Sequence, residues 1–594
     1  MPSDPPAARA TGGDWMRLAA LAVGLGAILS YHAAGRAFYA GFHVPQGTGM
    51  THLLPEELAH IALFSAFGLA AVAGLTIALV ATSVAERSAE ALRALTDHGL
   101  AVAWITAIGM TAATWWIGAT HLGHSVTTDD EHVYRFIAQT LRGGALVAPS
   151  PGADLDFFRE QFVVLTDTAR YGKYPIGHPL LLALGQWAGL ETLVVPLTVG
   201  FLAVSVYALA RRLFSPGVGV ASLLLLATSP QVLLTGATFL SQPLSALCLV
   251  GGLLALWNGL VPEIRGGWLA LAGAVLGYGL LVRPLPGALF VLVAAILLAV
   301  RLLRVRGLWP SLRPLAAFTA GPLAAVLLWL ALNRMQSGSS LTTGYQTFHA
   351  TGGGSAGALQ MLGGSLAEIG MSLVSAGLRL SVWLLGWPMA PLLCLAAFGD
   401  GRGRWLWAMV GAEVAYRVIA PKAGVGATGP LYLFEVVPLL VVLAAAGLVR
   451  LSRSSARARS AAVALVLAGL AVDLTMFLPV KLADLRDMGA AQRAPETLLH
   501  AQGVHHALVF HDGVVPWWTR RSWAYYPRCN SPALDDDVLF LHLHGPAPLE
   551  AARELWRRRF PDRGAWLFSY IDGSPRLLPL DQAMPTAEPR MPPL

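Results

Sequence analysis

The sequence predicts an all-α polytopic membrane protein with a small α/β domain at its C-terminal end. Three observations support this fold class. Hydrophobic residues make up 55% of the 594 residues and charged residues only 13%, which is far outside the usage of ordinary globular domains. No charged residue lies between Leu213 and Pro262, and this stretch is long enough for two membrane spans of about 20 residues each. After Val480 the apolar runs shorten, and arginines and aromatic residues become more frequent.

Apolar stretches along the chain predict about 13 transmembrane helices. Each is recognised by its length and by its small number of charged side chains. The first has a nearby arginine and small residues after it, so a cleaved signal peptide is an alternative interpretation of that segment alone. The predicted spans are residues 15–31, 60–82, 99–119, 192–210, 217–235, 240–257, 267–282, 286–303, 314–332, 374–398, 405–420, 431–450 and 461–480.

The placement of arginines predicts which ends of these helices face the cytoplasm. With the N-terminus inside, arginines concentrate in the connections that are then cytoplasmic, as the positive-inside rule requires. The 120–180 loop, the 333–373 loop, the Pro421–Gly429 connection and the C-terminal part then share the extracytoplasmic face. These anchors explain the net charge of +7, and no nucleic-acid partner is indicated. We therefore expect a multi-pass protein of the cell (inner or plasma) membrane, with the lipid bilayer as a partner.

Changes in composition predict three domains. An N-terminal transmembrane hairpin covers residues 1–98, and the main membrane domain covers residues 99–480 and carries the large 120–180 loop. Residues 481–594 are predicted to form an extracytoplasmic α/β domain, of a size that folds independently. Its predicted elements are strands at His506–Phe510 and Val538–Leu541 and a helix at Glu550–Arg559.

Three consecutive acidic residues, Asp129, Asp130 and Glu131, follow an apolar span that ends near Thr120. Ionisable groups this close to lipid are functional candidates, because a charge beside the bilayer is costly. Adjacent carboxylates also raise the pKa of at least one of them by mutual repulsion, which makes a better base. The alternative is that the acids stabilise the N-terminus of the helix that follows, and the two roles are compatible.

Two basic residues are candidates for binding an anion at the same face. Lys173 is one of only three lysines and returns from the 120–180 loop; an ammonium group is a compact charge that suits a phosphate. Arg283 stands at the outside end of a span, where its guanidinium needs an anion or the headgroup layer. Anchoring at the membrane interface is the alternative for both residues.

Further candidates for contacting a substrate are Tyr174, His178, Tyr345, Tyr432 and Glu435. Aromatic rings suit the face of a sugar or an isoprenoid, although interfacial aromatic belts are the commoner reason for tyrosines at such positions. A lone histidine at a helix start, such as His178, is more often structural. Glu435 lies four residues into an apolar span, where a carboxylate is expensive unless it is paired or functional. Arg283 is a conceivable partner for it.

Several segments occur in a defined order that is more specific than any one of them: DDEHVYRFIAQTLRGG, GKYPIGHPLLLALG, RRLF, TSPQVLLTGATFLSQP, LLVRPLPGAL, LNRMQSGSSLTTGYQ, WLLGWP and TGPLYLFEVVP. In this order the chain, over roughly residues 99–450, resembles the bacterial membrane glycosyltransferases of the GT-C class. These are relatives of the protein O-mannosyltransferases and of the transferase that adds aminoarabinose to lipid A, and are similar to glycosyltransferase family 39.

The resemblance implies a GT-C fold and an inverting transferase that moves a sugar from a polyprenyl-phosphate donor to an acceptor at the outer face of the membrane. Whether the acceptor is protein, lipid or polysaccharide stays open. The acidic pair in the first large outside loop of the class maps onto Asp130 and Glu131. Displacing a phosphate from an anomeric carbon requires a base for the acceptor hydroxyl and positive charge for the leaving phosphate.

We therefore assign Asp130 as the base and Lys173 and Arg283 as ligands of the donor phosphate. Glu131 is expected to support the base, hold a metal or bind the acceptor, and Asp129 is the weaker catalytic candidate. No cofactor is predicted other than a divalent cation, Mg²⁺ or Mn²⁺, held by Asp130 and Glu131. Because such cations usually take more ligands than these, we expect only weak metal dependence.

Three positions depart from the pattern of the relatives. Ser-His in relatives is Ser241-Gln242 here, Gly-Pro-Arg-Tyr is Gly429-Pro430-Leu431-Tyr432, and Tyr-Pro-Pro or Lys-Pro-Pro is Lys173-Tyr174-Pro175-Ile176. The missing histidine and arginine put phosphate contacts at those positions in doubt, so a non-catalytic subunit with the same fold is one alternative. A transporter or flippase of lipid-linked sugars is another, although the internal repeats typical of transporters are not found.

Motifs of other common functions are either absent or stand in the wrong structural context. Gly424, Gly426 and Gly429 match GxGxxG, but they lie between membrane spans without a preceding soluble strand, so a dinucleotide site is not indicated. The P-loop and HExxH patterns do not occur, which removes the usual ATPase and zincin interpretations.

Overall fold

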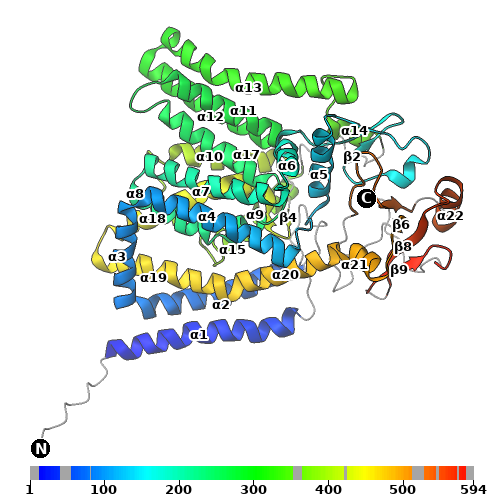
Figure 1. Cartoon of the computed structure of the whole chain (residues 1–594). Coiled ribbons are helices and arrows are strands. Elements are labelled where there is room, and N and C mark those ends of the chain that lie inside the picture. Colours follow the sequence, from blue (N-terminus) through cyan, green and yellow to red (C-terminus); the bar gives the residue numbers. More distant parts are fainter. Residues whose placement is uncertain are drawn as a thin grey trace, which may run out of the picture.

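The computed structural model describes residues 12–39, 55–80, 82–351, 364–420, 425–511, 527–543, 547–571 and 574–583. Within these residues the chain is mainly helical. Long helices lie side by side in a bundle, and short helices and strands gather at one end of it together with the C-terminal sheet (Figure 1). The predicted fold class, a helical membrane protein with a small C-terminal sheet region, is confirmed at this level.

Eight helical segments in the described part of the chain are long and apolar enough to cross a membrane, or nine if one bent pair counts as a single span. The predicted number of about 13 is therefore not confirmed. The eight contain α1 (Gly12–Tyr39), α2 (Pro55–Leu79), α4 (Gly99–Ile117), α7 (Val194–Leu213), α12 (Pro284–Arg306), α13 (Leu308–Ser337), α18 (Val437–Ser452) and α19 (Ala456–Val472). The bent pair is α8 (Pro216–Ala227) with α9 (Pro230–Gly236), at 61°.

The remaining predicted spans are shorter or interrupted. Helices α10 (Gln242–Asn258) and α11 (Gly266–Val282) are apolar but have only 17 residues each. The predicted span 374–398 is broken, because α15 (Leu366–Trp383) ends before a turn in which Gly386 has a φ of +70°, a conformation that glycine adopts readily. The short helix α16 (Leu392–Leu395) follows, and α17 (Arg404–Ile419) carries a buried Glu and Arg inside its apolar sequence.

The N-terminal hairpin of α1 and α2 packs against α19. Tyr31 of α1 contacts Phe64 of α2 edge to face, and Phe64 in turn contacts Phe477 in the helical segment that continues α19. The hairpin therefore covers the face of the bundle opposite α13 (Figure 1).

Helices α11 and α13 pack backbone against backbone because glycines line their contact. A Cβ atom on Gly273 would lie 1.9 Å from the carbonyl oxygen of Phe318, and one on Gly277 would lie 2.8 Å from that of Gly321. A Cβ on Gly321 would lie 2.3 Å from the amide nitrogen of Ala274. Small residues permit this close approach, which membrane helices use in place of hydrophobic burial.

The segments predicted to share the outer face do lie at one end of the bundle. Helices α5 (Asp129–Arg142), α6 (Gly177–Trp187) and α14 (Gly344–Ala350) gather there, whereas α3 (Ser83–Asp97) lies at the other end (Figure 1). The 120–180 loop also forms a three-stranded antiparallel sheet in the order β1-β3-β2. Its strands are β1 (Ala148–Pro149), β2 (Val163–Leu165) and β3 (Ala169–Gly172). A two-residue pair, β4 (Val425–Gly426) with β5 (Gly429–Pro430), precedes α18.

The C-terminal part forms a four-stranded sheet in the order β7-β6-β8-β9, in which β6 is parallel to β7 and β8 and antiparallel β9 closes one edge. Both predicted strands and the predicted helix are present. The elements are β6 (Ala507–His511), β7 (Val538–His542), α22 (Pro548–Arg559), β8 (Gly564–Ile571) and β9 (Ser574–Pro579). The predicted boundary at residue 480 falls inside a continuous helix, α20 (Leu478–Gln492), followed by α21 (Ala494–Ala501), so the sheet begins only after Ala501.

The 120–180 loop and the C-terminal sheet share one hydrophobic core. Phe158 and Leu165 from the loop pack with Leu508 and Phe510 of β6. At the rim of this contact, Arg558 of α22 forms an ion pair of 2.6 Å with Asp154. The 120–180 loop and the C-terminal sheet therefore make a single unit at this end of the bundle, which we call the outer unit.

Replacing Gly321 by valine is expected to destabilise the protein, because the new side chain would meet the backbone of α11. We expect a loss of about 1–3 kcal/mol or more in the free energy of unfolding, as for other overpacked sites. The matched control is Gly109→Val on α4, where a Cβ atom has no heavy atom within 4 Å. Denaturation of the detergent-purified variants measures the difference; equal stability of the two would contradict the backbone contact.

Candidate active site

Helix α5 places the three predicted acidic residues in its first turn. Its N-cap, Thr128, makes no side-chain cap, and burial together with the neighbouring Asp130 carboxylate raises the pKa of Asp129 to about 7. The predicted effect of adjacent carboxylates is thus present, with burial as its larger cause. The alternative role is present too, since negative charges at this position complement the helix dipole.

Glu131 is completely buried and holds the start of α5 in place. Its Oε1 accepts hydrogen bonds from the amide and hydroxyl of Thr127 at 2.7 and 2.6 Å, and its Oε2 accepts one from the amide of Phe239 at 2.7 Å. Burial raises the pKa of Glu131 to about 7 against the opposing effect of these bonds. With both oxygens engaged, its direct contribution here is to tie α5 to the segment before α10.

Asp130, like Asp129, is half-buried, whereas Glu131 is completely buried. The hydroxyl of Tyr174 donates a hydrogen bond to its Oδ1. The carboxylate also lies close enough to raise the pKa values of Lys173 and Tyr345 by its charge. Residues predicted from three distant parts of the sequence are therefore brought together around Asp130.

Lys173 lies in a cage of aromatic rings. Its Nζ is 3.2 Å from the centroid of the Phe162 ring and between 5.0 and 5.5 Å from those of Tyr174, Tyr345 and Phe348. Only 9% of the residue is exposed, and burial lowers its pKa to about 8 although the two aspartates of α5 act in the opposite direction. This differs from the alternative of a lysine extended into the headgroup layer, and it leaves a cation beside Asp130.

Arg283 and Glu435 form the ion pair that the sequence suggested. The Nε of Arg283 lies 2.7 Å from Oε1 of Glu435, which is fully buried. Neither the Nε nor either carboxylate oxygen has a partner in good hydrogen-bond geometry within the described residues. The ring of Tyr432 lies 5.5 Å from the guanidinium carbon of Arg283. The pair is thus balanced in charge, although its geometry leaves these three buried atoms without a hydrogen bond in the part of the chain that the structure describes.

A second buried ion pair adjoins the first and was not predicted. Arg417 of α17 lies 2.7 Å from Glu413, one turn earlier on the same helix, and also donates to the carbonyl of Tyr432 at 3.0 Å. Its guanidinium lies 5.1 Å from the Tyr432 ring, so that ring is close to two guanidinium groups. The signal for this pair is in the sequence: two opposite charges four residues apart inside an apolar span.

His178 makes a buried contact of the kind that its alternative, structural role requires. It is buried, its Nε2 shares a hydrogen bond of 2.7 Å with the carbonyl oxygen of Phe239, and burial lowers its pKa to about 4. Next to it lies Tyr134, whose hydroxyl is 3.1 Å from that of Ser241 and whose ring packs against Tyr174. Sequence analysis did not single out Tyr134 as a site residue.

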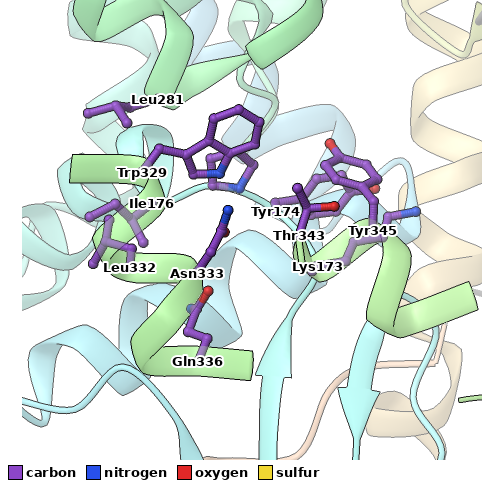
Figure 2. Close-up of a pocket in the computed structure, with 12 residues that line it drawn as sticks. Lys173, Tyr174, Ile176, Leu281, Trp329, Leu332, Asn333, Gln336, Thr343 and Tyr345 are labelled. Atoms are coloured by element: carbon purple, nitrogen blue, oxygen red, sulfur yellow. The ribbon is translucent and has the colours of Figure 1, made fainter. Parts of the chain in front are cut away.

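A pocket opens beside the lysine cage (Figure 2). Trp329, Asn333 and Gln336, which share one face of α13, form one wall, and Lys173 with Tyr345 lies across from them. Remaining lining residues are Tyr174, Pro175, Ile176, Leu281, Leu332, Thr343 and Gly344. The pocket thus joins the outer end of α13 to the segment that bears the predicted site residues.

No group of three metal-ligating side chains occurs among the residues that the structure describes. The oxygens of Glu131 are already engaged as acceptors, so Asp129 and Asp130 are the carboxylates of this turn with room for another partner. The expected weak dependence on Mg²⁺ or Mn²⁺ stays a prediction.

Comparison with known proteins identifies the fold. Residues 185–329 match the family model of the dolichyl-phosphate-mannose-protein mannosyltransferases. The structure is similar to that of ArnT from Cupriavidus metallidurans in the apo state, with 16% identity and a TM-score of 0.51 over 78% of this chain and 92% of that one. The structure of ArnT from the same organism bound to undecaprenyl phosphate is similar too, with 15% identity and a TM-score of 0.50 over the same shares of the two chains. No curated protein matches the chain.

The chain has the GT-C fold. The resemblance predicted from the sequence is thereby confirmed, and the predicted enzyme class, glycosyltransferase, is that of the matched family. The GT-C fold accounts for the helical bundle with its outer unit. The N-terminal hairpin packs on this bundle as described above.

Two of the departures from the GT-C pattern can now be placed. Gln242, which stands where the relatives have the histidine, is buried directly after Ser241, and Leu431 is buried next to Tyr432. Although an arginine is missing at residue 431, the guanidinium of Arg417 reaches the carbonyl of Tyr432 from the neighbouring helix. A positive charge is therefore still present at this corner of the site.

Replacing Glu435 by glutamine is expected to lower the free energy of unfolding by about 3–5 kcal/mol, because it leaves a buried guanidinium without its anion. The control is Asp156→Asn, which breaks an exposed pair with Arg159 of 2.7 Å and should cost less than about 1 kcal/mol. Chemical denaturation in detergent compares the two. Equal losses would show that the Arg283–Glu435 pair is effectively solvated.

Proposed function

We propose that the protein is an inverting glycosyltransferase that moves a sugar from a polyprenyl-phosphate donor to an acceptor at the extracytoplasmic face of the cell membrane. The observation that carries the proposal is the gathering of Asp130, Lys173 and the Arg283–Glu435 pair around Tyr345 and Tyr432. A base and cations for a leaving phosphate are thus available in one place. The GT-C fold and the family match support the same reaction class.

In the proposed reaction, the oxygen of an acceptor hydroxyl attacks the anomeric carbon from the side opposite the phosphate. Asp130 takes the hydroxyl proton, the new carbon–oxygen bond forms and the bond to the phosphate oxygen breaks with its electron pair. The polyprenyl phosphate leaves as an anion, and attack from the opposite face inverts the anomeric centre. A positioned general base contributes typically 10² to 10⁴-fold to such a step.

The leaving phosphate is the part of the reaction that needs positive charge. Lys173 supplies a compact ammonium in a desolvated cage, and in such a site electrostatic stabilisation is stronger than in water. Arg283 is the second proposed ligand; Glu435 lies at its Nε, and we propose that the phosphate binds at the other guanidinium nitrogens. That ArnT has been solved with undecaprenyl phosphate supports a donor of this chemical class.

The aromatic residues near this centre are proposed to contact the donor or acceptor. Tyr345 and Tyr174 pack edge to face with ring centroids 5.6 Å apart and border the pocket. Tyr432 borders the arginine side. His178 hydrogen-bonds to the backbone carbonyl of Phe239 and is proposed to position this part of the site.

The competing functions are a flippase of lipid-linked sugars and a non-catalytic subunit. Both would use the same membrane bundle and a phosphate-binding site, but neither needs a base. The hydrogen bond that Tyr174 donates to Asp130 holds the carboxylate beside Lys173, and this favours the transferase.

The substitution Asp130→Asn is expected to lower sugar transfer by about 10²-fold or more, the size of losing a general base. Transfer is measured into membranes from a panel of radiolabelled polyprenyl-phosphate sugars, with the exposed Asp156→Asn as matched control. Transfer from one donor that is lost only in Asp130→Asn identifies the sugar. Equal transfer by both variants would place the base elsewhere, and no transfer from any donor would favour the flippase or the non-catalytic subunit.

The pH dependence of donor use should report the lowered pKa of Lys173. Below about pH 8 its ammonium is charged and binds the phosphate; above that value it becomes neutral, so kcat/KM for the donor is expected to fall as pH rises through about 8. In Lys173→Arg the side chain stays charged, because the arginine pKa is above 12, and this alkaline decrease should disappear. An unchanged decrease in that variant would assign it to another group.

A further inference from the structure

We propose that the C-terminal sheet is part of the catalytic apparatus: through Asn530 and Glu160 it holds the turn at Phe162 that positions Lys173. This rests on the proposed function, in which Lys173 binds the donor phosphate. Asn530, Glu160 and Phe162 are positioning residues, since none of them is assigned a contact with a substrate.

Asn530 joins the C-terminal sheet to the 120–180 loop. Its side chain pairs with Phe540 of β7 as a strand neighbour would: Nδ2 donates to the Phe540 carbonyl and Oδ1 accepts from the Phe540 amide, each at 2.8 Å. Its backbone amide and Nδ2 donate to Oε1 of Glu160 at 2.6 and 3.0 Å. Both residues are buried, so these bonds are not exchanged for water.

A buried arginine of β3 adds further contacts between the 120–180 loop and the C-terminal part. Arg170 is fully buried, lies 3.5 Å from Oε2 of Glu160, and donates to the carbonyl oxygens of Ser531 and Pro532 at 2.9 and 3.2 Å. Its guanidinium also lies 5.4 Å from the ring of Phe136 in α5. A single buried network therefore connects the C-terminal part with the strand and the helix that carry the proposed site residues.

The network ends at a strained turn. The amide of Val163 donates to the carbonyl of Glu160, and Phe162 between them has a φ of +64°. This conformation suits glycine and costs a residue with a side chain about 1–2 kcal/mol. Such strain persists where the surroundings determine the backbone, and it is typical of functional sites. Here the surroundings include the hydrogen bonds of Asn530 to Glu160.

The strained residue is the one that contacts Lys173 most closely. The amide of Lys173 donates to the Phe162 carbonyl at 3.0 Å, and the Lys173 ammonium lies over the Phe162 ring. If the turn relaxed, both the backbone and the cation would lose their support. The position of the proposed phosphate ligand is thus determined by residues of the C-terminal part, far away in the sequence.

The test compares Asn530→Ala with Asp154→Asn. The second breaks the ion pairs of Asp154 with Arg558 and Arg559, at 2.6 and 3.6 Å, in the same contact between loop and C-terminal part but away from the turn. We expect Asn530→Ala to raise KM for the donor about tenfold, the size of losing a desolvated cation–π contact, with little change in kcat. The alkaline decrease in kcat/KM should move to higher pH as Lys173 becomes hydrated. Asp154→Asn should change neither.

Two substitutions at Phe162 test the same step without touching the C-terminal sheet. Phe162→Leu should reproduce the higher KM and the shifted pH profile, and Phe162→Tyr, which keeps the aromatic ring, should restore both. If Asn530→Ala and Phe162→Leu reduce only the amount of folded enzyme and leave KM and the pH profile unchanged, the residues are merely structural and the proposal is wrong.

A measurement that needs no activity separates this inference from the proposed function. Hydrogen–deuterium exchange of residues 160–174 is expected to be faster in Asn530→Ala than in the wild type, and unchanged in Asp154→Asn. Faster exchange in a protein that transfers no sugar would support the positioning of Lys173 while overturning the transferase. Unchanged exchange would overturn the positioning whatever the activity.

Discussion

The cost of placing charged groups beside a bilayer is the constraint on which the site depends. An ionised group there needs a partner, and the charges at the outer end of the bundle have one within the protein. Arg283 meets Glu435 and Arg417 meets its neighbour on α17, while Lys173 lies among aromatic rings. Because these partners come from different helices and loops, neutralising the charges also assembles the site.

Buried polar contacts also hold the outer unit together and attach it to the membrane helices. Glu131 and His178 both bond to the backbone of Phe239, so α5 and α6 are held on the membrane helices at one point. On the other side, Glu160 and Asn530 hold the loop to the C-terminal sheet. The loop that carries the proposed base and lysine is therefore fastened between two supports, and its geometry does not depend on its own short strands alone.

Much of the fold and part of the candidate site could be predicted from the sequence, for physical reasons. Length and hydropathy predict the membrane helices, and an isolated carboxylate in an apolar span led to the correct partner for Glu435. The predicted number of spans is not confirmed, and hydropathy does not register a break such as that after Trp383 or the bend of α8 and α9. It also missed Arg417, since a charge pair inside a span was read as part of the span.

The sequence by itself determined the class of protein, the face on which the polar residues gather and the residues worth testing, because composition and charge spacing are local properties of the chain. Only the tertiary structure decided their surroundings: Glu131 is buried with both oxygens bonded, Asp130 accepts a hydrogen bond from Tyr174, and Lys173 lies over the ring of Phe162. Those surroundings depend on burial and on contacts between residues far apart in the chain, and no local pattern in the sequence encodes which of several similar carboxylates will be enclosed.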